Sequence, residues 1–569
     1  MKKAGNSKSE KRDPADDSGN NGLTGAMDRR RFLRSMGAGS FAAAASALFF
    51  SQLACQGGES RTSSTGNNAR GSRKRKGVNR PNILFVLADD QSWPHAGAMG
   101  DKVVKTPAFD RIAREGVLFT HSFAACPSCT ASRSAILSGQ DIWRVQEAGV
   151  LFGSIPPDLK MYPLLLEDAG YHTGFTGKGW APGNWNDLGS TRYPIGKEYN
   201  DRREGHIAAG IDKRDYSANF DDFLAARSDG EPFCFWFGST EPHLIYEEGV
   251  GQENGLKLED VDVPPFFPDV PEVRNNILDY YYEIQWYDSH LASMLARLEE
   301  IGELENTLIV VTSDNGMPFP RAKTTLYDWG TRMPLAIRWG DEIQGGRVID
   351  DFVCHTDFAP TFLEAAGVSV PEEMTGRSLL PLLKSDKQGQ VDSSRDRVFT
   401  ATERHTWCRP DGATYPVRAL RTAEYLYMRN YEPDRWPTGG DSFVSSNKTF
   451  HGDVDACETK RFMTNPVNMK KYKKQYQLCF GKRPPEELYK VADDPGQIHN
   501  LADDPDYRAI KSKFRSELEA HLTRTGDPRM SGKNPWPDYI YHQTDGFGAR
   551  YNMSLSPETR ARHTLRPGN

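Results

Sequence analysis

The stretch Asn82-Ile-Leu-Phe-Val-Leu-Ala-Asp-Asp90 is a short apolar run that ends in two carboxylates. Such a continuous run is typical of a strand buried on both faces of a parallel sheet, whereas a half-exposed strand alternates apolar and polar residues. Residues 232–237 and 307–312 repeat the pattern. Helix signals separate these runs, so the sequence predicts an α/β fold with a large doubly wound mixed sheet sandwiched by helices.

Two of the helices can be predicted from their ends. Thr106 precedes Pro107, and Gly116 closes the apolar repeat, so we expect a helix with Thr106 as its N-cap. Residues 272–301 show a longer helical repeat that Gly302 closes. Its apolar stripe predicts core packing and consists of Val273, Ile277, Tyr280, Ile284, Trp286, Leu291, Leu295 and Leu298.

Oxygen-bearing side chains directly follow two of the buried runs. Asp89 and Asp90 end the first, and Asp314 and Asn315 follow 307–312. Ligands of doubly wound sheets bind at the carboxyl ends of strands, and adjacent carboxylates repel each other unless a cation lies between them. Four oxygen donors suit calcium, with magnesium as the alternative, and the lack of His or Cys disfavours zinc. Asp pairs also occur in turns and helix caps, so that interpretation stays open.

The segment Cys126-Pro-Ser-Cys-Thr-Ala-Ser-Arg-Ser-Ala-Ile-Leu-Ser-Gly139 places a cysteine at the start of a predicted helix. Cys129 and Arg133 are one helical turn apart and therefore share a face. The N–H groups and partial positive charge of a helix N-terminus favour an oxyanion there. Cys126 and Cys129 could instead form a redox pair or half of a zinc site, but the eight cysteines include no second Cys-x-x-Cys.

This segment resembles the signature of the sulfatase family, Cys-x-Pro-x-Arg followed by a helix of small residues. Further similar segments are Gly170-Tyr-His-Thr-Gly-Phe-Thr-Gly-Lys178 and Ser239-Thr-Glu-Pro-His243. Ser313-Asp-Asn-Gly-Met-Pro-Phe-Pro, with Lys323 downstream, resembles the heparan N-sulfatase (sulfamidase) branch. The resemblance extends from about residue 82 to about residue 528.

The resemblance implies a chemistry and a set of residues. In the family the cysteine is oxidised to formylglycine (3-oxoalanine), whose hydrate is the nucleophile, so a formylglycine-generating or radical maturation enzyme is an implied partner. The residues that match the catalytic positions are Cys129, Arg133, Lys178, His243 and Lys323, and those that match the metal ligands are Asp89, Asp90, Cys129, Asp314 and Asn315. The implied function is hydrolysis of sulfate ester or sulfamate groups of sulfated carbohydrates. Phosphonate or phosphodiester hydrolysis and non-catalytic glycan binding are the alternatives.

Three positions depart from the family pattern. Ala131 stands where most members have proline, and Lys323 stands where the sulfamidase branch has arginine. Trp180 replaces a histidine that helps to regenerate the aldehyde in the family. Tryptophan cannot accept that proton, so the sequence leaves this base unnamed.

The chain after residue 386 indicates a second, smaller domain. Residues 415–421 and 425–428 alternate as short antiparallel strands, and one amphipathic helix follows, marked by Tyr507, Ile510, Phe514, Leu518 and Leu522. We expect a catalytic domain at 81–386, an α+β domain with an antiparallel sheet at 387–525, and a tail at 526–569.

The smaller domain also offers candidate binding residues. In the family this domain adds side chains to the sugar-binding rim, and the candidates here are Arg404, His405 and Arg418. Cys457 and Cys479 could form a disulfide, although their spacing does not require one.

The N-terminal residues resemble a twin-arginine export signal. Asp28-Arg-Arg-Arg-Phe-Leu-Arg34 precedes an uncharged stretch that reaches Ala54, so residues 1–54 predict a signal region and 55–80 a flexible linker. We therefore expect export to the bacterial periplasm by the twin-arginine (Tat) translocase. A transmembrane helix fits less well, because the stretch is short and rich in small residues. Leu53-Ala54-Cys55 also allows a lipid anchor.

The two parts of the chain differ in net charge. The first 80 residues hold 16 Lys and Arg and 6 Asp and Glu, a net charge of +10. The remainder holds 55 Lys and Arg and 71 Asp and Glu, a net charge of −16. An acidic body argues against nucleic acid as a partner. An anionic substrate would need local positive charge in its binding site.

Overall fold

The computed structural model describes residues 80–542, apart from residues 206 and 441–449. The predicted signal region at 1–54, nearly all of the predicted linker, and the tail from residue 543 onward lie outside the described residues. The domain boundaries and the export signal therefore stay predictions.

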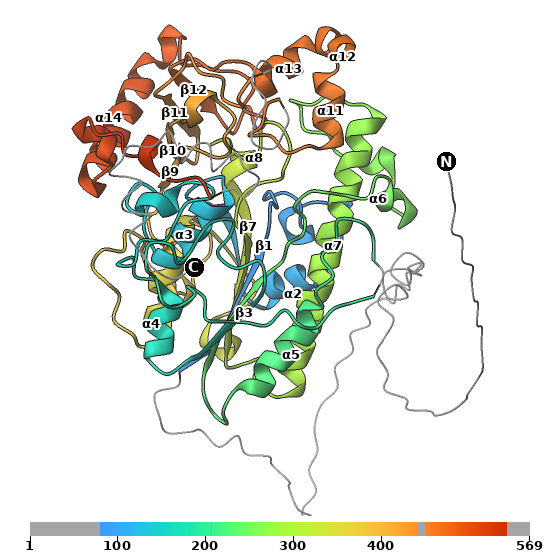
Figure 1. Cartoon of the computed structure of the whole chain (residues 1–569), viewed down its shortest axis with the longest axis vertical. Helices are drawn as coiled ribbons and strands as arrows, with labels where there is room; N and C mark the ends of the chain where they lie inside the picture. Colours follow the sequence, from blue (N-terminus) through green and yellow to red (C-terminus); the bar gives the residue numbers. More distant parts are fainter. Residues whose placement is uncertain (1–79, 206, 441–449, 543–569) are drawn as a thin grey trace, which may run out of the picture. The chain divides into compact units, whose positions relative to one another are not determined.

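An eight-stranded mixed sheet lies at the centre of residues 81–386, the region predicted as the catalytic domain (Figure 1). The strand order is β4-β3-β5-β1-β6-β7-β2-β8, in which β7 is antiparallel to both of its neighbours and the other pairs are parallel. The bounds are β1 Asn82–Ala88, β2 Val117–Phe123, β3 His172–Gly177, β4 Lys197–Glu198, β5 Phe233–Gly238, β6 Thr307–Ser313, β7 Arg332–Arg338 and β8 Arg347–Cys354. The predicted mixed, doubly wound sheet is confirmed.

Strand β1 lies between two hydrophobic cores, which explains its continuous apolar run. Odd-numbered side chains such as Phe85 pack in one core, and even-numbered side chains such as Val86 pack in the other. The first core includes α3 (Cys129–Ser138), α4 (Tyr162–Asp168) and α9 (Phe358–Ala365). The second includes α2 (Pro107–Glu115), α5 (Tyr216–Ala226) and α7 (Pro271–Glu300), which Figure 1 shows on the other side of the sheet.

Both helices predicted from their ends are present, but the cap of α2 differs from the prediction. The Thr106 side chain does not cap α2, because its hydroxyl oxygen accepts from Gly97 N at 2.9 Å and its O–H donates to Asp110 Oδ1 at 3.1 Å. Asp288 of α7 takes this role, since its carboxylate accepts from the backbone N–H groups of Ala108 at 2.8 Å and Phe109 at 2.9 Å. A residue distant in sequence therefore supplies the cap.

A second, antiparallel sheet has the order β12-β11-β10-β9. Its strands are β9 Arg397–Thr402, β10 Val417–Thr422, β11 Tyr425–Asn430 and β12 Glu486–Lys490. Helix α14 (Arg508–Thr525) packs on this sheet through Phe514, Leu518 and Leu522, as predicted. The remaining α-helices of the described residues are α6 Val250–Glu253, α8 Asp328–Thr331, α10 Leu380–Leu383, α11 Glu458–Thr464, α12 Pro466–Lys471 and α13 Lys473–Phe480.

Cys457 and Cys479 are not joined by a disulfide. Both thiols are free and buried, so that possibility is wrong. Cys457 Sγ accepts from Lys460 N at 3.3 Å, and Cys479 Sγ donates to Phe266 O at 3.4 Å. Each thiol therefore has a hydrogen-bond partner other than the second cysteine.

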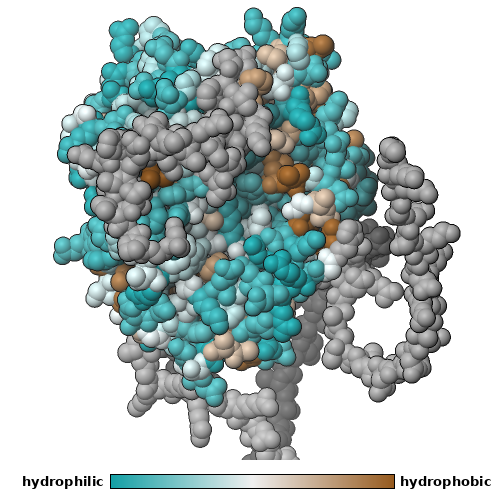
Figure 2. Space-filling view, viewed as in Figure 1, coloured by the Kyte–Doolittle hydropathy of each residue, from teal (hydrophilic) through white to brown (hydrophobic). Residues whose placement is uncertain are grey.

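Hydrophilic side chains dominate the face shown in Figure 2. Within residues 80–542, no described helix combines the length and the apolar composition needed to span a bilayer.

Candidate active site

The ends of β1 and β6 bring the predicted oxygen donors together. The two strands are parallel neighbours, and Ala88 pairs with Ser313, so the next residues of each strand lie side by side. Asp90 N donates to Asp314 Oδ1 at 3.1 Å, and Asn315 Nδ2 donates to Asp90 Oδ1 at 2.5 Å. Asp90 has a φ of 76°, a left-handed conformation that is uncommon outside glycine and occurs often at functional sites.

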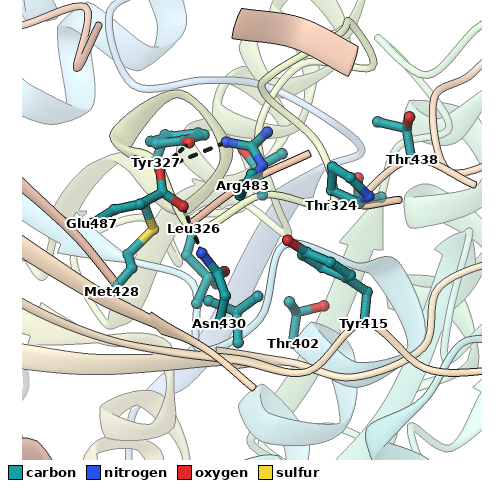
Figure 3. A pocket seen from close by; sticks show the side chains of 13 residues that line it. Thr324, Leu326, Tyr327, Thr402, Tyr415, Met428, Asn430, Thr438, Arg483 and Glu487 are labelled. Carbon is teal, nitrogen blue, oxygen red and sulfur yellow. Dashed lines mark hydrogen bonds and ion pairs between the residues drawn. The ribbon is translucent and has the colours of Figure 1, made fainter. Parts of the chain in front are cut away.

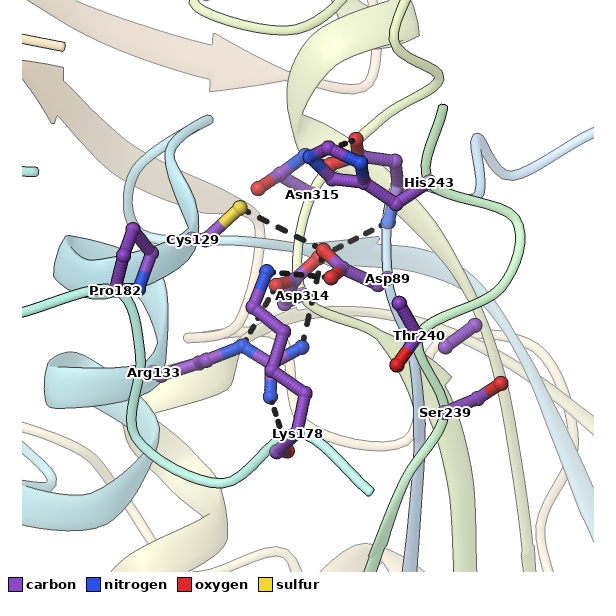
Figure 4. A network of polar contacts seen from close by, with 12 residues as sticks. Asp89, Cys129, Arg133, Lys178, Pro182, Ser239, Thr240, His243, Asp314 and Asn315 are labelled. Atoms are coloured by element: carbon purple, nitrogen blue, oxygen red, sulfur yellow. Dashed lines mark hydrogen bonds and ion pairs between the residues drawn. The ribbon is translucent and has the colours of Figure 1, made fainter. Parts of the chain in front are cut away.

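Helix α3 presents Cys129 to this cluster. The helix begins at Cys129, whose side chain is buried at 2% exposure and whose Sγ lies 3.5 Å from Asp89 Oδ1 (Figure 4). One turn along, Arg133 Nε donates to Asp314 Oδ2 at 2.8 Å. Arg133 Nη1 donates to the carbonyls of Lys178 at 2.7 Å and Gly179 at 2.9 Å. Arg133 therefore joins the helix, the carboxylates and the segment after β3.

Two lysines carry positive charge into the cluster. Lys178, just after β3, forms an ion pair with Asp89. Lys323 Nζ lies 2.7 Å from Asp90 Oδ2 and 3.1 Å from Asp455 Oδ2. Burial opposes the charged form of each lysine, but the neighbouring carboxylates outweigh it and raise the pKa of both groups. Both lysines are therefore protonated cations at neutral pH.

His243 follows β5 and has a fixed orientation. Its Nδ1 lies 2.7 Å from Leu244 O, and because a carbonyl only accepts, Nδ1 carries the hydrogen. Nε2 then faces the cluster, 3.7 Å from Asp90 Oδ2. The side chain is 30% exposed, so a ligand can reach it.

The three carboxylates differ in proton affinity. Burial opposes ionisation of Asp89, but Lys178, His243 and Arg133 together outweigh it and hold its pKa below the ordinary value. Burial raises the pKa of Asp314 to about 6, and the charge of Asp89 adds to this effect. Burial likewise raises the pKa of Asp90. Such raised values mark a place where a cation would stabilise the ionised forms.

The Cys129 thiol is a poor nucleophile as it stands. Burial, with the nearby charges of Asp89 and Asp314, raises its pKa well above the ordinary value. A neutral thiol neither attacks nor binds a metal well, because both roles belong to the thiolate.

Two further residues beside the cluster were missed from the sequence. Asp455 forms the ion pair with Lys323, and its carboxylate lies within 4.8 Å of the facing atoms of Asp90 and His243. Ser128, the residue before Cys129, has its Oγ 2.8 Å from Nδ1 of His405. Asp455 follows no strand and belongs to no motif, so the sequence carries no signal that would single it out.

Of the three predicted rim residues, only His405 lies beside the cluster. Arg418 is fully buried and pairs with Glu403 at 2.7 Å and Asp527 at 2.6 Å. Arg404 is buried and donates to the carbonyls of Tyr539 and Ile540 at 3.0 and 3.2 Å. The structure therefore places these two arginines inside the protein rather than on a rim, because buried carboxylates and carbonyls use their donors.

Trp180 points into the core. Its Nε1 donates to Ser134 Oγ of α3 at 2.8 Å, and the indole packs among the apolar residues of the first core. Tryptophan at this position therefore supports the helix that carries Cys129.

A cavity lined in part by the residues that follow Lys323 in the sequence is too small to hold a substrate. It has a volume of about 20 Å³ and is lined by Tyr327, Tyr415, Asn430, Arg483 and Glu487, among others (Figure 3). Sites for small molecules usually have volumes of about 300–1,000 Å³.

Comparison with known proteins identifies the family. The sulfatase family model matches residues 81–368, half of the chain. The chain belongs to the sulfatase family. A second model, for the C-terminal part of N-sulphoglucosamine sulphohydrolase, matches residues 321–437 of this sulfatase and confirms the predicted resemblance to the sulfamidase branch. It is therefore an enzyme of the sulfuric ester hydrolase class.

Two curated relatives cover most of this sulfatase. An ulvan-active sulfatase from Formosa agariphila is 27% identical over 486 residues, which are 84% of this chain and 87% of that protein. Human N-sulphoglucosamine sulphohydrolase is 27% identical over 491 residues, 79% of this chain and 91% of that protein.

Solved structures support the fold. One protein, bound to its substrate D-glucosamine-2-N,6-O-disulfate, has a TM-score of 0.57 and 20% identity, and covers 80% of this chain and 100% of its own. A phosphonate monoester hydrolase from Silicibacter pomeroyi has the same TM-score at 18% identity, covering 79% of this chain and 97% of its own. At these identities the similarity concerns the fold alone.

Proposed function

We propose that this sulfatase hydrolyses sulfate ester or sulfamate groups of sulfated carbohydrates, with formylglycine derived from Cys129 as the nucleophile and calcium as the metal. The observation that carries the proposal is the position of Cys129 Sγ, 3.5 Å from Asp89 Oδ1, with Lys178 paired to the same carboxylate. A buried, neutral thiol cannot perform the chemistry itself, so a modified side chain at this position accounts for its place among charged groups.

The residues fit a calcium ion. Asp89, Asp90 and Asp314 offer carboxylate oxygens, and Asn315 Oδ1 is buried and accepts no hydrogen bond within the described residues. Oxygen ligands of this kind suit calcium, with magnesium as the alternative. When bound, the ion supplies Lewis-acid activation of the nucleophilic oxygen.

The protein's own side chains have separate roles in the proposed reaction. Lys178, Lys323 and Arg133 place positive charge where a sulfuryl group carries negative charge. His243 holds Nδ1–H against Leu244 O, which leaves Nε2 facing the cluster; the imidazolium form would give its Nε2 proton to the departing oxygen or nitrogen and become the neutral Nδ1–H ring. Trp180 cannot transfer a proton. His405, whose ring lies next to Ser128, is a neutral imidazole, because burial lowers its pKa to about 4.

A sulfated glycan is the proposed substrate. The relatives named above include sulfatases of ulvan and of N-sulphoglucosamine, and a protein of the same fold binds disulfated glucosamine. His243 and Asp455 are both partly exposed, so Nε2 of the neutral His243 ring and the Asp455 carboxylate offer a sugar two hydrogen-bond acceptors next to the cations.

The test combines mass spectrometry with a substrate panel. The tryptic peptide that contains Cys129, taken from protein made in its native host, should carry formylglycine, and sulfate should be released from at least one sulfated oligosaccharide. Phosphate and phosphonate esters serve as matched substrates, and faster turnover of those would favour the phosphonate hydrolase alternative. A C129A variant that keeps full activity would reject the proposed nucleophile.

The proposal extends to partners and location. A formylglycine-generating or radical maturation enzyme would modify Cys129, and the Tat translocase would export the protein to the periplasm. Replacing Arg29 and Arg30 by lysine should retain the enzyme in the cytoplasm. Unchanged periplasmic activity would reject this route.

A further inference from the structure

A second cavity lies near the C-terminal end of α3, the helix that begins at Cys129. It has a volume of about 610 Å³, within the range of ligand sites. Asp141, which follows the end of α3, lines it together with residues of β8, β9 and α14; Figure 1 labels α3, β9 and α14. Helix α3 has ten residues and is therefore about 15 Å long, and none of the residues around Cys129 described above lines this cavity.

Asp141 offers an acceptor to this cavity. The residue is 7% exposed, and its Oδ2 accepts no hydrogen bond in the part of the chain that the structure describes. Its backbone N–H donates to Thr375 Oγ1 at 3.0 Å, which fixes the residue at the cavity wall. A buried oxygen without a partner is costly, and a ligand hydroxyl would satisfy it.

Two arginines offer positive charge. Arg377 Nη1 donates to Ser394 Oγ at 2.9 Å, and its closest carboxylate oxygen is on Asp392 at 3.9 Å. Arg524 is exposed and donates Nη2 to His521 Nδ1 at 3.0 Å. A guanidinium has five N–H donors, so each arginine keeps donors for an anion. Arg397, in contrast, is already paired with Asp396 and Glu517.

An imidazole and an aromatic ring form part of the wall. His521 stacks on Phe399, with ring centroids 3.6 Å apart and an interplanar angle of 8°. Because His521 Nδ1 accepts from Arg524, Nε2 carries the hydrogen of the neutral ring. That Nε2 is buried and has no hydrogen-bond partner among the described residues. It is a neutral N–H group that can donate to a hydroxyl oxygen.

We propose that this cavity is a second saccharide-binding site, which takes an acidic sugar unit that carries a sulfate or carboxylate group. Two guanidiniums select an anion, whereas Asp141 would repel a bare anion and instead accepts from a hydroxyl. A ligand with both groups on one ring satisfies both demands. The inference rests on the proposed function, because such units belong to the sulfated polymers on which the active site would act.

A second site would increase the affinity for long substrates without changing the chemistry. A polymer held at two places dissociates more slowly than one held at a single place. A short aryl sulfate reaches only the active site, so its KM should not depend on the residues of the cavity.

The experiment uses the full chain and three variants. R377A/R524A removes both cations of the cavity, and D141N keeps the shape of Asp141 while removing its charge. R461A is the matched control, because Arg461 is an exposed arginine outside the cavity, paired with Glu248 at 3.4 Å. KM is measured for a sulfated hexasaccharide prepared from heparan sulfate and for an aryl sulfate, and thermal unfolding confirms that each variant is folded.

We expect R377A/R524A to raise KM for the hexasaccharide about tenfold, the loss of roughly 1.4 kcal/mol of binding. KM for the aryl sulfate and kcat for both substrates should stay unchanged, and R461A should match the wild type. An unchanged KM for the hexasaccharide in R377A/R524A would overturn the proposal. An equal rise for the aryl sulfate would also overturn it, because the effect would then arise at the active site.

Calorimetry with the C129A variant separates this proposal from the proposed function. The C129A chain should bind the hexasaccharide, and the same chain with R377A/R524A should bind it more weakly. If no sulfated sugar is hydrolysed but this difference persists, the cavity proposal stands and the proposed function fails. Inorganic sulfate is the second probe, and sulfate that displaces the hexasaccharide from the cavity at equal concentration would show an anion site rather than a sugar site.

Discussion

Replacing Lys323 by methionine tests whether Asp455 belongs to the cluster of charged residues around Cys129. Lys323 is 4% exposed, and its Nζ lies 2.7 Å from Asp90 Oδ2 and 3.1 Å from Asp455 Oδ2. K323M keeps most of the side-chain volume but leaves the buried Asp90 and the partly exposed Asp455 without their cation. Breaking a buried ion pair in this way costs about 3–5 kcal/mol of unfolding free energy. D455N, which removes one charge and keeps an acceptor, should cost about 1–2 kcal/mol.

The double variant K323M/D455N makes the prediction specific. Because each single change removes the same contact, the double variant should be more stable than the two losses added together predict, with a coupling energy of about 1–3 kcal/mol. The exposed pair Arg202–Asp222 has a similar N–O distance of 2.8 Å and is the control, for which we expect a coupling below about 1 kcal/mol.

The assays are urea denaturation and sulfate release from an aryl sulfate. We expect kcat/KM of K323M to fall about 10²- to 10³-fold, because a buried cation near the reacting group stabilises developing charge. Strictly additive losses of stability would refute the contact between Lys323 and Asp455. Activity of K323M within a factor of about three of the wild type would refute its electrostatic role.

Three further predictions concern other parts of the protein. Burial raises the pKa of Asp141 to about 7, so the folded state binds this proton more tightly than the unfolded state does. The free energy of unfolding should therefore fall by at most about 4 kcal/mol as the pH rises from about 4 to about 7. In urea titrations across this range, the unfolding free energy of D141N should change less with pH than that of the wild type. D288A should lower the unfolding free energy by about 2 kcal/mol, because two N–H groups at the start of α2 lose their acceptor, and D288N should restore part of the loss. Calcium at 100 times its Kd should stabilise the wild type by about 2.7 kcal/mol in thermal unfolding, and N315A should need more calcium for the same shift.

The main sheet could be predicted because its signal is local. A strand such as β1, buried on both faces, needs a continuous apolar run, and its end fixes where Asp89 and Asp90 lie. The pairing of β1 with β6 then brings Asp314 beside them without any long-range signal in the sequence. The amphipathic helix α14 could also be predicted, because its repeat of apolar residues lies within a single segment.

The features that the sequence did not indicate depend on contacts between distant segments. Ser128 and His405 are 277 positions apart, and Lys323 and Asp455 are 132 apart. The same physics explains the cap of α2, where a carboxylate from α7 replaces the local Thr106 side chain. Arg418 resembled an exposed rim residue, because a sequence does not show that Glu403 and Asp527 will surround it.

The burial of Cys129 determines whether its proposed modification can occur before or after folding. In the folded chain α3 and the carboxylates enclose the thiol, so the proposed maturation enzyme would reach it only while the surrounding segment is extended and accessible. Under the proposed mechanism, modification must come before the chain closes. Protein that folds first would keep its thiol permanently, and a host without the maturation enzyme would yield a stable, well-folded catalyst with no activity.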